Sequence, residues 1–268
     1  MWIYLAIGLL GIVGGMLVNY LADVLPIKRR LVAPLCTHCG ATQSWHGYLL
    51  WPRRCAACGT ERSARVWFVE VAFVVATLAL YALPEMRSVV DNFWMGYAIL
   101  LFFGVVAVID IEYKLILHPV SWFGVGLGLI VGLTLHGWQE TLLGGVVGYG
   151  VMYVLYGLGA LFIRLLGKMR GEAIDDVALG FGDVNLMGVL GLMLGPGNVF
   201  LNLLLSIAVA ALISLLVIGW NLVRRQYRVG MAIPYGPFLI LGAVLLLFFP
   251  ETAQEMLKII FPVFALVD

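Results

Sequence analysis

The chain has 268 residues, of which 63% are hydrophobic and only 12% are charged, and its mean hydropathy is +1.04. A soluble globular domain has no use for so much apolar surface, so this composition excludes that class and predicts a polytopic α-helical membrane protein with the lipid bilayer as its partner. The basic residues form short clusters beside apolar segments instead of covering one face, so we expect no nucleic-acid partner.

Apolar segments of membrane-spanning length follow one another along the chain and predict about eight transmembrane helices. The sixth is interrupted by Gly191, Gly195 and Gly197, and the closing segment 251–268 is too short and mixed to span, so we expect it along the surface. The predicted spans cover residues 2–22, 66–84, 93–110, 119–135, 141–163, 180–196, 199–220 and 231–249.

The distribution of lysine and arginine predicts the orientation of these spans. With eight spans, 14 of the 16 basic residues fall on one side, and only Arg87 and Lys258 fall on the other. Basic residues favour cytoplasmic loops, so the basic side is predicted to be cytoplasmic and both termini to lie outside. The start Met1-Trp2-Ile3-Tyr4 lacks the basic region and the cleavage site of a removable signal peptide, so we interpret residues 1–26 as a retained first span.

Glycines recur at helical spacing in three of the predicted spans. Small residues let helix backbones approach closely in lipid, so these positions predict helix–helix contacts. They are Gly8, Gly11 and Gly15 in the first span, Gly124, Gly128 and Gly132 in the fourth, and Gly144 and Gly148 in the fifth.

All four cysteines lie in the predicted cytoplasmic loop 27–64, as the pairs Cys36-x2-Cys39 and Cys55-x2-Cys58. Thiols in a reducing compartment rarely form disulfides, and two such pairs can enclose a tetrahedral Zn²⁺. A loop this small has little core, so the metal would stabilise a zinc-ribbon-like fold and would have no catalytic role. A redox dithiol or free thiols are the alternatives. His38 and His46 are either substitute ligands or ordinary loop residues.

Two aspartates occur where a membrane protein tolerates them least. Asp110 closes the third span, and Asp183 closes the tetrapeptide Gly180-Phe181-Gly182-Asp183 at the start of the sixth. A carboxylate near hydrocarbon is costly unless water, a partner or function compensates. Odd spans run inward and even spans outward, so both aspartates are expected at the cytoplasmic membrane face. Taken singly, each could instead be an interfacial anchor or the partner of a basic residue.

A pair of carboxylates at one depth predicts an aspartic dyad. Two nearby carboxylates do not both ionise easily, so one accepts a proton from water while the other, protonated, polarises the scissile carbonyl. Gly180 and Gly182 remove two Cβ atoms beside Asp183, which permits close approach of substrate or backbone. Asp110 and Asp183 are therefore the predicted catalytic residues, supported by the two glycines.

The other carboxylates have less specific interpretations. Glu112, Asp175 and Asp176 are expected to be solvated in loops, and Asp23 to be interfacial. Glu70 lies inside the second predicted span, where it either pairs with a basic residue or lines a functional cavity.

Five motifs in order resemble the type IV prepilin peptidases, a family of membrane-embedded Gly-x-Gly-Asp aspartic proteases, over most of the chain. They are Gly15-Met16-Leu17-Val18-Asn19 with Pro26, Arg54-Cys55-Ala56-Ala57-Cys58-Gly59 with Ser63-Ala64-Arg65 and Val69-Glu70, Ile109-Asp110-Ile111, Gly180-Phe181-Gly182-Asp183-Val184, and Ile233-Pro234-Tyr235-Gly236-Pro237-Phe238.

The resemblance implies a multi-pass protein of the bacterial inner membrane. It would cleave the leader of type IV prepilins or type II secretion pseudopilins at the cytoplasmic face, and many bacterial members then methylate the new N-terminus with S-adenosylmethionine. Ile116-Leu117-His118 replaces the family's usual Leu-Pro-Asp. His118 either takes a polar role near the dyad or simply begins the next helix before Pro119.

These expectations divide the chain into a first span (1–26), a cytoplasmic tetracysteine loop (27–64) and a transmembrane aspartic protease core (65–268). A proton- or cation-coupled transporter that uses buried carboxylates is the alternative from another class. An inactive assembly protein of a pilus system is the third, although retention of both aspartates argues against it.

Overall fold

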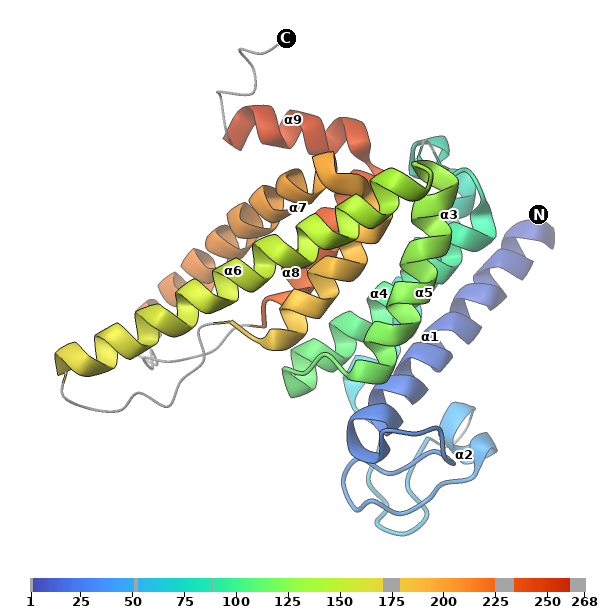
Figure 1. Cartoon of the computed structure of the whole chain (residues 1–268). Helices are drawn as coiled ribbons and strands as arrows, with labels where there is room; N and C mark the ends of the chain where they lie inside the picture. The colour runs from blue at the N-terminus through green and yellow to red at the C-terminus, as the bar shows by residue number, and fades with distance from the viewer. Residues whose placement is uncertain (1, 51–52, 88, 171–178, 225–233, 261–268) are drawn as a thin grey trace. The chain divides into compact units, whose positions relative to one another are not determined.

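The computed structural model describes residues 2–50, 53–87, 89–170, 179–224 and 234–260. Over this part of the chain the protein is built from helices (Figure 1). They divide into two compact units, one of residues 1–87 with 91–119 and one of residues 88–90 with 120–268. The expected all-α architecture is confirmed.

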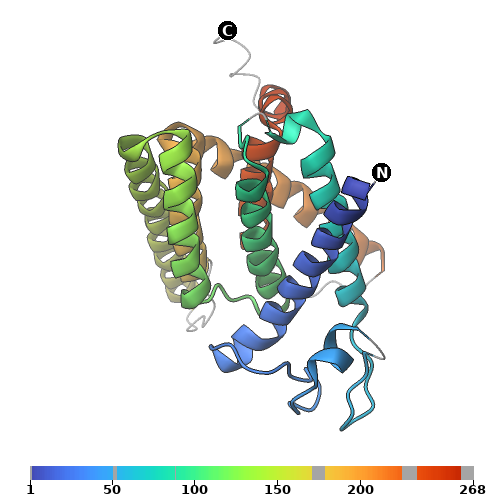
Figure 2. The same cartoon turned by 90° about the vertical axis from the view of Figure 1, so that its right-hand side faces the viewer.

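The first unit contains three long apolar helices, α1 (Trp2–Lys28), α3 (Ala64–Ala82) and α4 (Phe93–Tyr113), with the short α2 (Trp45–Leu49) and the 3₁₀ turn η1 (Pro84–Arg87). Helix α1 packs against α3 and α4, and the cysteine loop follows its C-terminal end (Figure 2). A Cβ atom at Gly15 would lie only 2.6 Å from Cα of Glu70, so α1 and α3 touch through their backbones. Gly11 makes a similar contact, whereas Gly8 faces open space and does not serve in packing.

The second unit contains α5 (His118–Leu135), α6 (Trp138–Arg170), α7 (Phe181–Val223), α8 (Gly236–Phe248) and α9 (Pro250–Ile260). Helices α6 and α7 pack closely, since a Cβ atom at Gly144 would lie 2.3 Å from the carbonyl oxygen of Gly191. Gly148 and Gly132 make equally close approaches to α7 backbone. The glycine pattern thus predicted the helix contacts of this unit.

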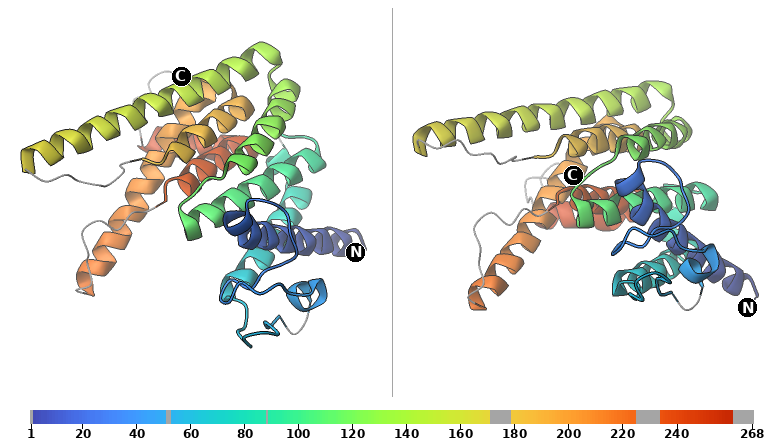
Figure 3. Two further views of the ribbon diagram at one scale, coloured as in Figure 1. Left: turned by 60° about the horizontal axis from the view of Figure 1, so that its bottom comes forward. Right: turned by 90° about the horizontal axis from the view of Figure 1, so that it is seen from below.

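Helix α7 contains a sharp break that joins two of the predicted spans. Gly195 has φ 72° and ψ 165°, which are not helical values, and Pro196 follows it. The halves before and after the break run in different directions (Figure 3). The predicted spans 180–196 and 199–220 are therefore the two halves of this one element, and the interruption expected at Gly195 is confirmed.

Six of the described helices are long and apolar enough to cross a membrane, namely α1, α3, α4, α5, α6 and α7. Because α7 holds two predicted spans and α8 is a shorter apolar helix, the eight predicted apolar segments all correspond to helix. Residues 231–233 of the last predicted span lie outside the described part. Helix α6 continues to Arg170, beyond the predicted end at residue 163, because the added residues include the good helix formers Leu165, Lys168 and Met169.

Helix α9 follows α8 and is amphipathic. It buries Ala253 and Leu257, four residues apart, while Glu251, Glu255 and Lys258 are exposed. This pattern is typical of a helix that lies along a surface, as expected for the start of segment 251–268. Residues 261–268 lie outside the described part.

Candidate functional site

The two cysteine pairs form matching turns in the first unit. In each turn the first cysteine exchanges backbone hydrogen bonds with residues that follow the second cysteine, as in Gly40 N–H to Cys36 O (2.9 Å) and Gly59 N–H to Cys55 O (2.8 Å). Gly40 and Gly59 both have φ near +70°, a value that favours glycine. The turns therefore place four thiols on facing sides of one small cluster.

The sulfur geometry of this cluster fits a tetrahedral metal ion. The Sγ atoms of Cys36 and Cys58 are 3.7 Å apart, those of Cys39 and Cys55 are 3.6 Å apart, and all four lie within 4.8 Å of one another. Four sulfurs bound at about 2.3 Å around one Zn²⁺ would lie about 3.8 Å apart. All four cysteines are free of disulfides. The donor set of the tetracysteine cluster thus suits a closed structural site.

The four thiols of the cluster differ in acidity. The backbone hydrogen bond of Ala41 lowers the pKa of Cys39, but hydrogen bonding to Cys58 and burial outweigh it and raise this pKa to about 12. Hydrogen bonds with the side chain and backbone of Thr60 lower the pKa of Cys58 to about 6, so this thiol ionises readily to the form that metals bind. The metal-ligating groups found together among the described residues are the four thiols alone. His38 and His46 are thus not part of the cluster, in agreement with their interpretation as loop residues.

Asp110 occupies the last turn of α4 in the first unit. Asp110 is the last residue on the buried face of this helix, which includes Phe103, Val106 and Ile109. Asp110 itself is only 5% exposed. The helix stops three residues later, where Lys114 adopts a left-handed conformation and donates its backbone N–H to the carbonyl oxygen of Asp110 (2.9 Å). The structure thus places this carboxylate at the end of an apolar helix, as predicted.

Asp183 lies in the first turn of α7 in the second unit and is 7% exposed. Its backbone N–H donates to the carbonyl oxygen of Gly180 (3.1 Å), and a Cβ atom at Gly180 would lie 3.2 Å from its Oδ2. The carboxylate therefore folds back over a position that has no side chain. It is also close enough to Tyr235, the residue before α8, to act electrostatically on the phenol.

Each aspartate is thus buried at a helix end within its own unit. The loop between α6 and α7, with Asp175 and Asp176, lies outside the described residues. The approach of Asp110 to Asp183 remains a prediction.

Glu70, on α3, is buried and pairs with a basic residue. Its Oε2 accepts from Nη1 of Arg53 at 3.0 Å, and the Arg53 guanidinium also lies over the Trp67 ring at 4.2 Å. Arg53 further donates to the carbonyl oxygens of Leu49 and Leu50. Of the two interpretations of Glu70, the ion pair is the one found, and it ties the cysteine loop to α3.

His118 is exposed and is the first residue of α5, directly before Pro119. Proline favours the first turn of a helix, where its missing N–H is not needed. This position agrees with the interpretation of His118 as a residue that begins the helix.

Asp23, which was predicted to be interfacial, lies near the end of α1 and is buried within the protein. Asp23 is 2% exposed and accepts three hydrogen bonds. Its Oδ2 accepts from Nη2 of Arg62 (2.8 Å) and from the Tyr48 hydroxyl (2.5 Å), and its Oδ1 accepts from Nη2 of Arg65 (2.5 Å). We call this group the Asp23 hub. Burial and the Asp23 charge raise the pKa of Tyr48, so the phenol stays protonated and donates. Glu112 is also not a free loop residue, because it lies in α4 and pairs with Arg65.

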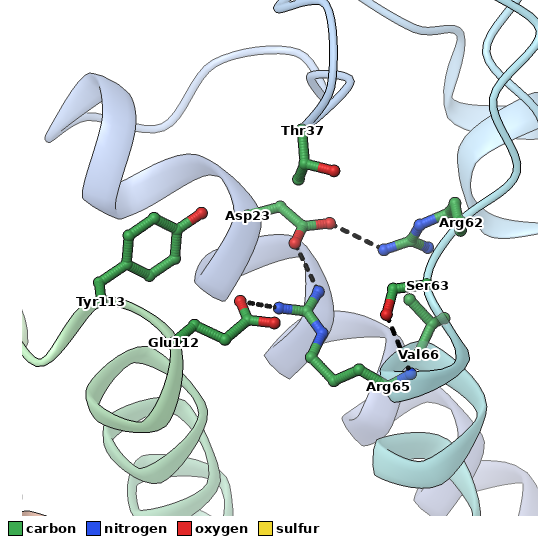
Figure 4. A pocket seen from close by; sticks show the side chains of 8 residues that line it. All are labelled: Asp23, Thr37, Arg62, Ser63, Arg65, Val66, Glu112 and Tyr113. Carbon is green, nitrogen blue, oxygen red and sulfur yellow. Dashed lines mark hydrogen bonds and ion pairs between the residues drawn. The ribbon is translucent and has the colours of Figure 1, made fainter. Parts of the chain in front are cut away.

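Beside this hub the first unit forms an open cavity of about 290 Å³. Figure 4 shows Asp23 between the two arginines, with Glu112 on the far side of Arg65. The lining residues are Asp23, Thr37, Arg62, Ser63, Arg65, Val66, Glu112 and Tyr113. Sequence reasoning missed this group, because its members come from four separate segments. The available signal was a carboxylate at the end of the first span with two arginines, Arg62 and Arg65, where the chain enters the second predicted span.

Comparison with known proteins finds a matching family model and several curated relatives that share one name. A model of the type IV leader peptidase family matches residues 97–215, which include both predicted catalytic aspartates. No solved structure matches the chain.

Curated relatives cover most of the chain. Proteins named prepilin leader peptidase/N-methyltransferase are 30% identical in Pseudomonas putida, over 78% of this chain and 69% of the relative, and 30% identical in Stutzerimonas stutzeri, over 83% and 74%. The relative of that name in Legionella pneumophila is 26% identical over 94% of this chain and 93% of its own length. With this identity and coverage, the chain belongs to the type IV prepilin leader peptidase family.

Proposed function

We propose that this protein is a membrane-embedded aspartic endopeptidase that cleaves the leader peptide of prepilins or of type II secretion pseudopilins. The observation that supports it most is the burial of Asp110 and Asp183, each at the end of an apolar helix, inside the region that the family model matches. Buried carboxylates at such positions are costly, and they persist where function requires them. No observation on the described residues favours the transporter alternative.

The proposed chemistry needs one charged and one protonated carboxylate. The ionised member removes a proton from a water molecule, which attacks the scissile carbonyl carbon, while the protonated member donates a hydrogen bond to the carbonyl oxygen. The proton held by the dyad then passes to the leaving amine, so the pair returns to its starting state. Gly180 leaves room for the Asp183 carboxylate in this arrangement.

The reaction is proposed to occur at the cytoplasmic face of the inner membrane, with both chain termini outside. The distribution of lysine and arginine supports this orientation, because 14 of these 16 residues fall on the side of the cysteine loop when eight spans are assumed. Asp110 ends α4, which enters from the other side, and Asp183 begins α7. Both carboxylates then lie at the face where a basic leader would be presented.

The tetracysteine cluster is proposed to hold a structural Zn²⁺ through Cys36, Cys39, Cys55 and Cys58. The sulfur spacing supports this metal, because four thiolates at these distances complete its tetrahedral shell and leave no open position. The metal would stabilise the cytoplasmic loop and take no part in peptide hydrolysis.

The chain is also proposed to methylate the amine that cleavage releases. Curated relatives at 26–30% identity are named as both leader peptidases and N-methyltransferases, and the cysteine loop is present in this chain. S-adenosylmethionine would supply the methyl group.

The test is a cleavage assay in lipid membranes with a prepilin substrate and labelled S-adenosylmethionine. Asp110→Asn and Asp183→Asn should each abolish leader release while inserting normally. Asp91→Asn, which changes an exposed aspartate just before α4, serves as the matched control and should cleave like the wild type. Unimpaired cleavage by either test variant would remove that residue from the mechanism, and a wild-type product without label would limit the activity to proteolysis.

A further inference from the structure

The cavity beside Asp23 is a mixed-charge site that peptide hydrolysis does not use. Its walls come from the end of α1, the first cysteine turn, the start of α3 and the end of α4. At about 290 Å³ it has the size of a small ligand site. In Figure 4 Asp23 lies at the centre, with Thr37 above it, Arg62 on one side, Tyr113 and Glu112 on the other side, and Arg65 below.

The charges of the cavity cancel, because two carboxylates face two guanidinium groups. Asp23 is saturated by Arg62, Arg65 and Tyr48, so it holds the arginines in place and has little capacity left for a ligand. A formally neutral cavity of this kind attracts neither a simple cation nor a simple anion. It suits a ligand that carries one charge of each sign.

Two charged side chains of the cavity are partly open to a ligand. The Arg65 side chain is 17% exposed, although its Nε is buried and is not reached from the cavity. Glu112 uses Oε2 for Arg65, its side chain is 33% exposed, and its Oε1 receives no hydrogen bond from the described part of the chain. A ligand therefore meets one partly exposed guanidinium group and one free carboxylate oxygen.

We propose that this cavity is the binding site for the methyl donor, a zwitterionic sulfonium compound, which deepens the proposed methyltransferase function and rests on it. The donor's α-carboxylate lies by Arg65, and its cationic groups lie by Oε1 of Glu112 and the ring of Tyr113, where cation–π attraction adds to the charge interaction. S-adenosylmethionine has both features, in its amino-acid end and its sulfonium. The rest of the molecule extends from the open side.

The position of the cavity on α4 suits a reaction that follows cleavage. Glu112 comes two residues after Asp110, which is about 200° around the helix and about 3 Å along it. One helix end thus carries the predicted cleavage carboxylate on one side and the donor cavity on another. The new N-terminal amine has to pass only around this helix end.

The transfer itself balances with groups already named. The neutral amine nitrogen forms a bond to the methyl carbon as the carbon–sulfur bond breaks, and that electron pair stays on sulfur to give a neutral thioether. The methylated nitrogen then releases one proton to solvent water at the open side of the cavity. No oxidant or reductant is involved.

Titration calorimetry of the full chain in lipid nanodiscs, with S-adenosylmethionine as the probe and no pilin present, tests this assignment. Glu112→Gln removes the acceptor charge and should weaken donor binding about tenfold or more. Thr37→Trp fills the cavity from its rim and should abolish binding. Glu61→Gln, an exposed glutamate of the second cysteine turn, is the matched control and should bind like the wild type.

Zinc content and leader cleavage measured on the same samples show whether each variant is folded. Absent donor binding in the wild type, or unchanged binding in both test variants, would overturn the assignment and leave the cavity as an ion-pair cluster that fastens the loop. Donor binding that follows the expected order, in a protein that does not cleave prepilin, would instead contradict the proposed peptidase and support this site.

Discussion

The absence of a Cβ atom at Gly180 leaves room for the Asp183 carboxylate. Gly180 is positioned so that any side chain would approach Oδ2 to 3.2 Å, closer than a relaxed contact. At a catalytic carboxylate, small displacements matter, because proton transfer and water activation depend on hydrogen-bond geometry.

Gly180→Ala should therefore lower the rate of leader cleavage, by about tenfold for a shift of a few tenths of an ångström, without loss of insertion. Gly157→Ala in α6 is the matched control, since its Cβ would meet nothing within 4 Å. Cleavage rates in membranes containing equal amounts of each variant give the comparison. Equal rates for the two variants would show that Gly180 has no role in placing the carboxylate.

Individual buried charges were the hardest residues to predict. The pairing of Glu70 was foreseen only as one of two interpretations, and Asp23 was assigned to the interface. Their partners are arginines 17 to 42 residues away in sequence, namely Arg53 and Arg62 of the cysteine loop and Arg65 at the start of α3. Such contacts follow from the folded loop, and sequence spacing carries little information about them.

At the scale of elements, the cysteine loop has little core of its own. Its described residues form one five-residue helix and two isolated β-bridges, Leu35 with Thr42 and Arg54 with Glu61. The proposed metal would therefore supply much of the folding free energy of the loop.

Metal analysis of the purified protein should find about one zinc per chain, since four thiolates fill one tetrahedral shell. Cys39→Ser should lose the metal and make the loop sensitive to limited proteolysis, whereas His38→Ala, the adjacent residue outside the cluster, should keep both metal and resistance. A folded, protease-resistant loop without bound metal would refute the structural role.

The break in α7 is a second feature that acts at this scale. Gly195 adopts φ 72° and ψ 165°, a region that is nearly exclusive to glycine. His136 accompanies the break, with Nε2 3.1 Å from the carbonyl oxygen of Met193. The break lets two apolar segments follow one another in different directions without a long loop.

Gly195→Ala should reduce the free energy of unfolding by about 1–3 kcal/mol, because alanine is strained at this conformation. Gly197→Ala, two residues away with nothing near its Cβ, should be neutral or slightly stabilising. The free energies of unfolding of the two variants are compared by denaturation in mixed micelles. A Gly195→Ala variant as stable as Gly197→Ala would mean that the break does not require glycine.

For the whole molecule, hydropathy and glycine spacing predicted most of the architecture. Apolar length alone located the helices, and glycines at Gly11, Gly15, Gly144 and Gly148 marked where they touch. The extension of α6 to Arg170 was not predicted, because basic residues were assigned to a loop although they are good helix formers. The site was predicted as two carboxylates at helix ends, and each lies at such an end. The Asp23 cavity required a folded loop and was missed.

The central claim is that Asp110 and Asp183 act as one catalytic unit, and kinetics of single and double variants test it most directly. Leader cleavage would be measured for Asp110→Asn, Asp183→Asn and the double variant in the same lipid membranes. When two residues act together, the first substitution already removes most of their joint contribution to the rate. The cleavage rate of each single variant should therefore fall by about a thousandfold or more, and the double variant should cleave no more slowly than the slower single variant. Losses that multiply in the double variant, or a single variant that cleaves like the wild type, would contradict the dyad.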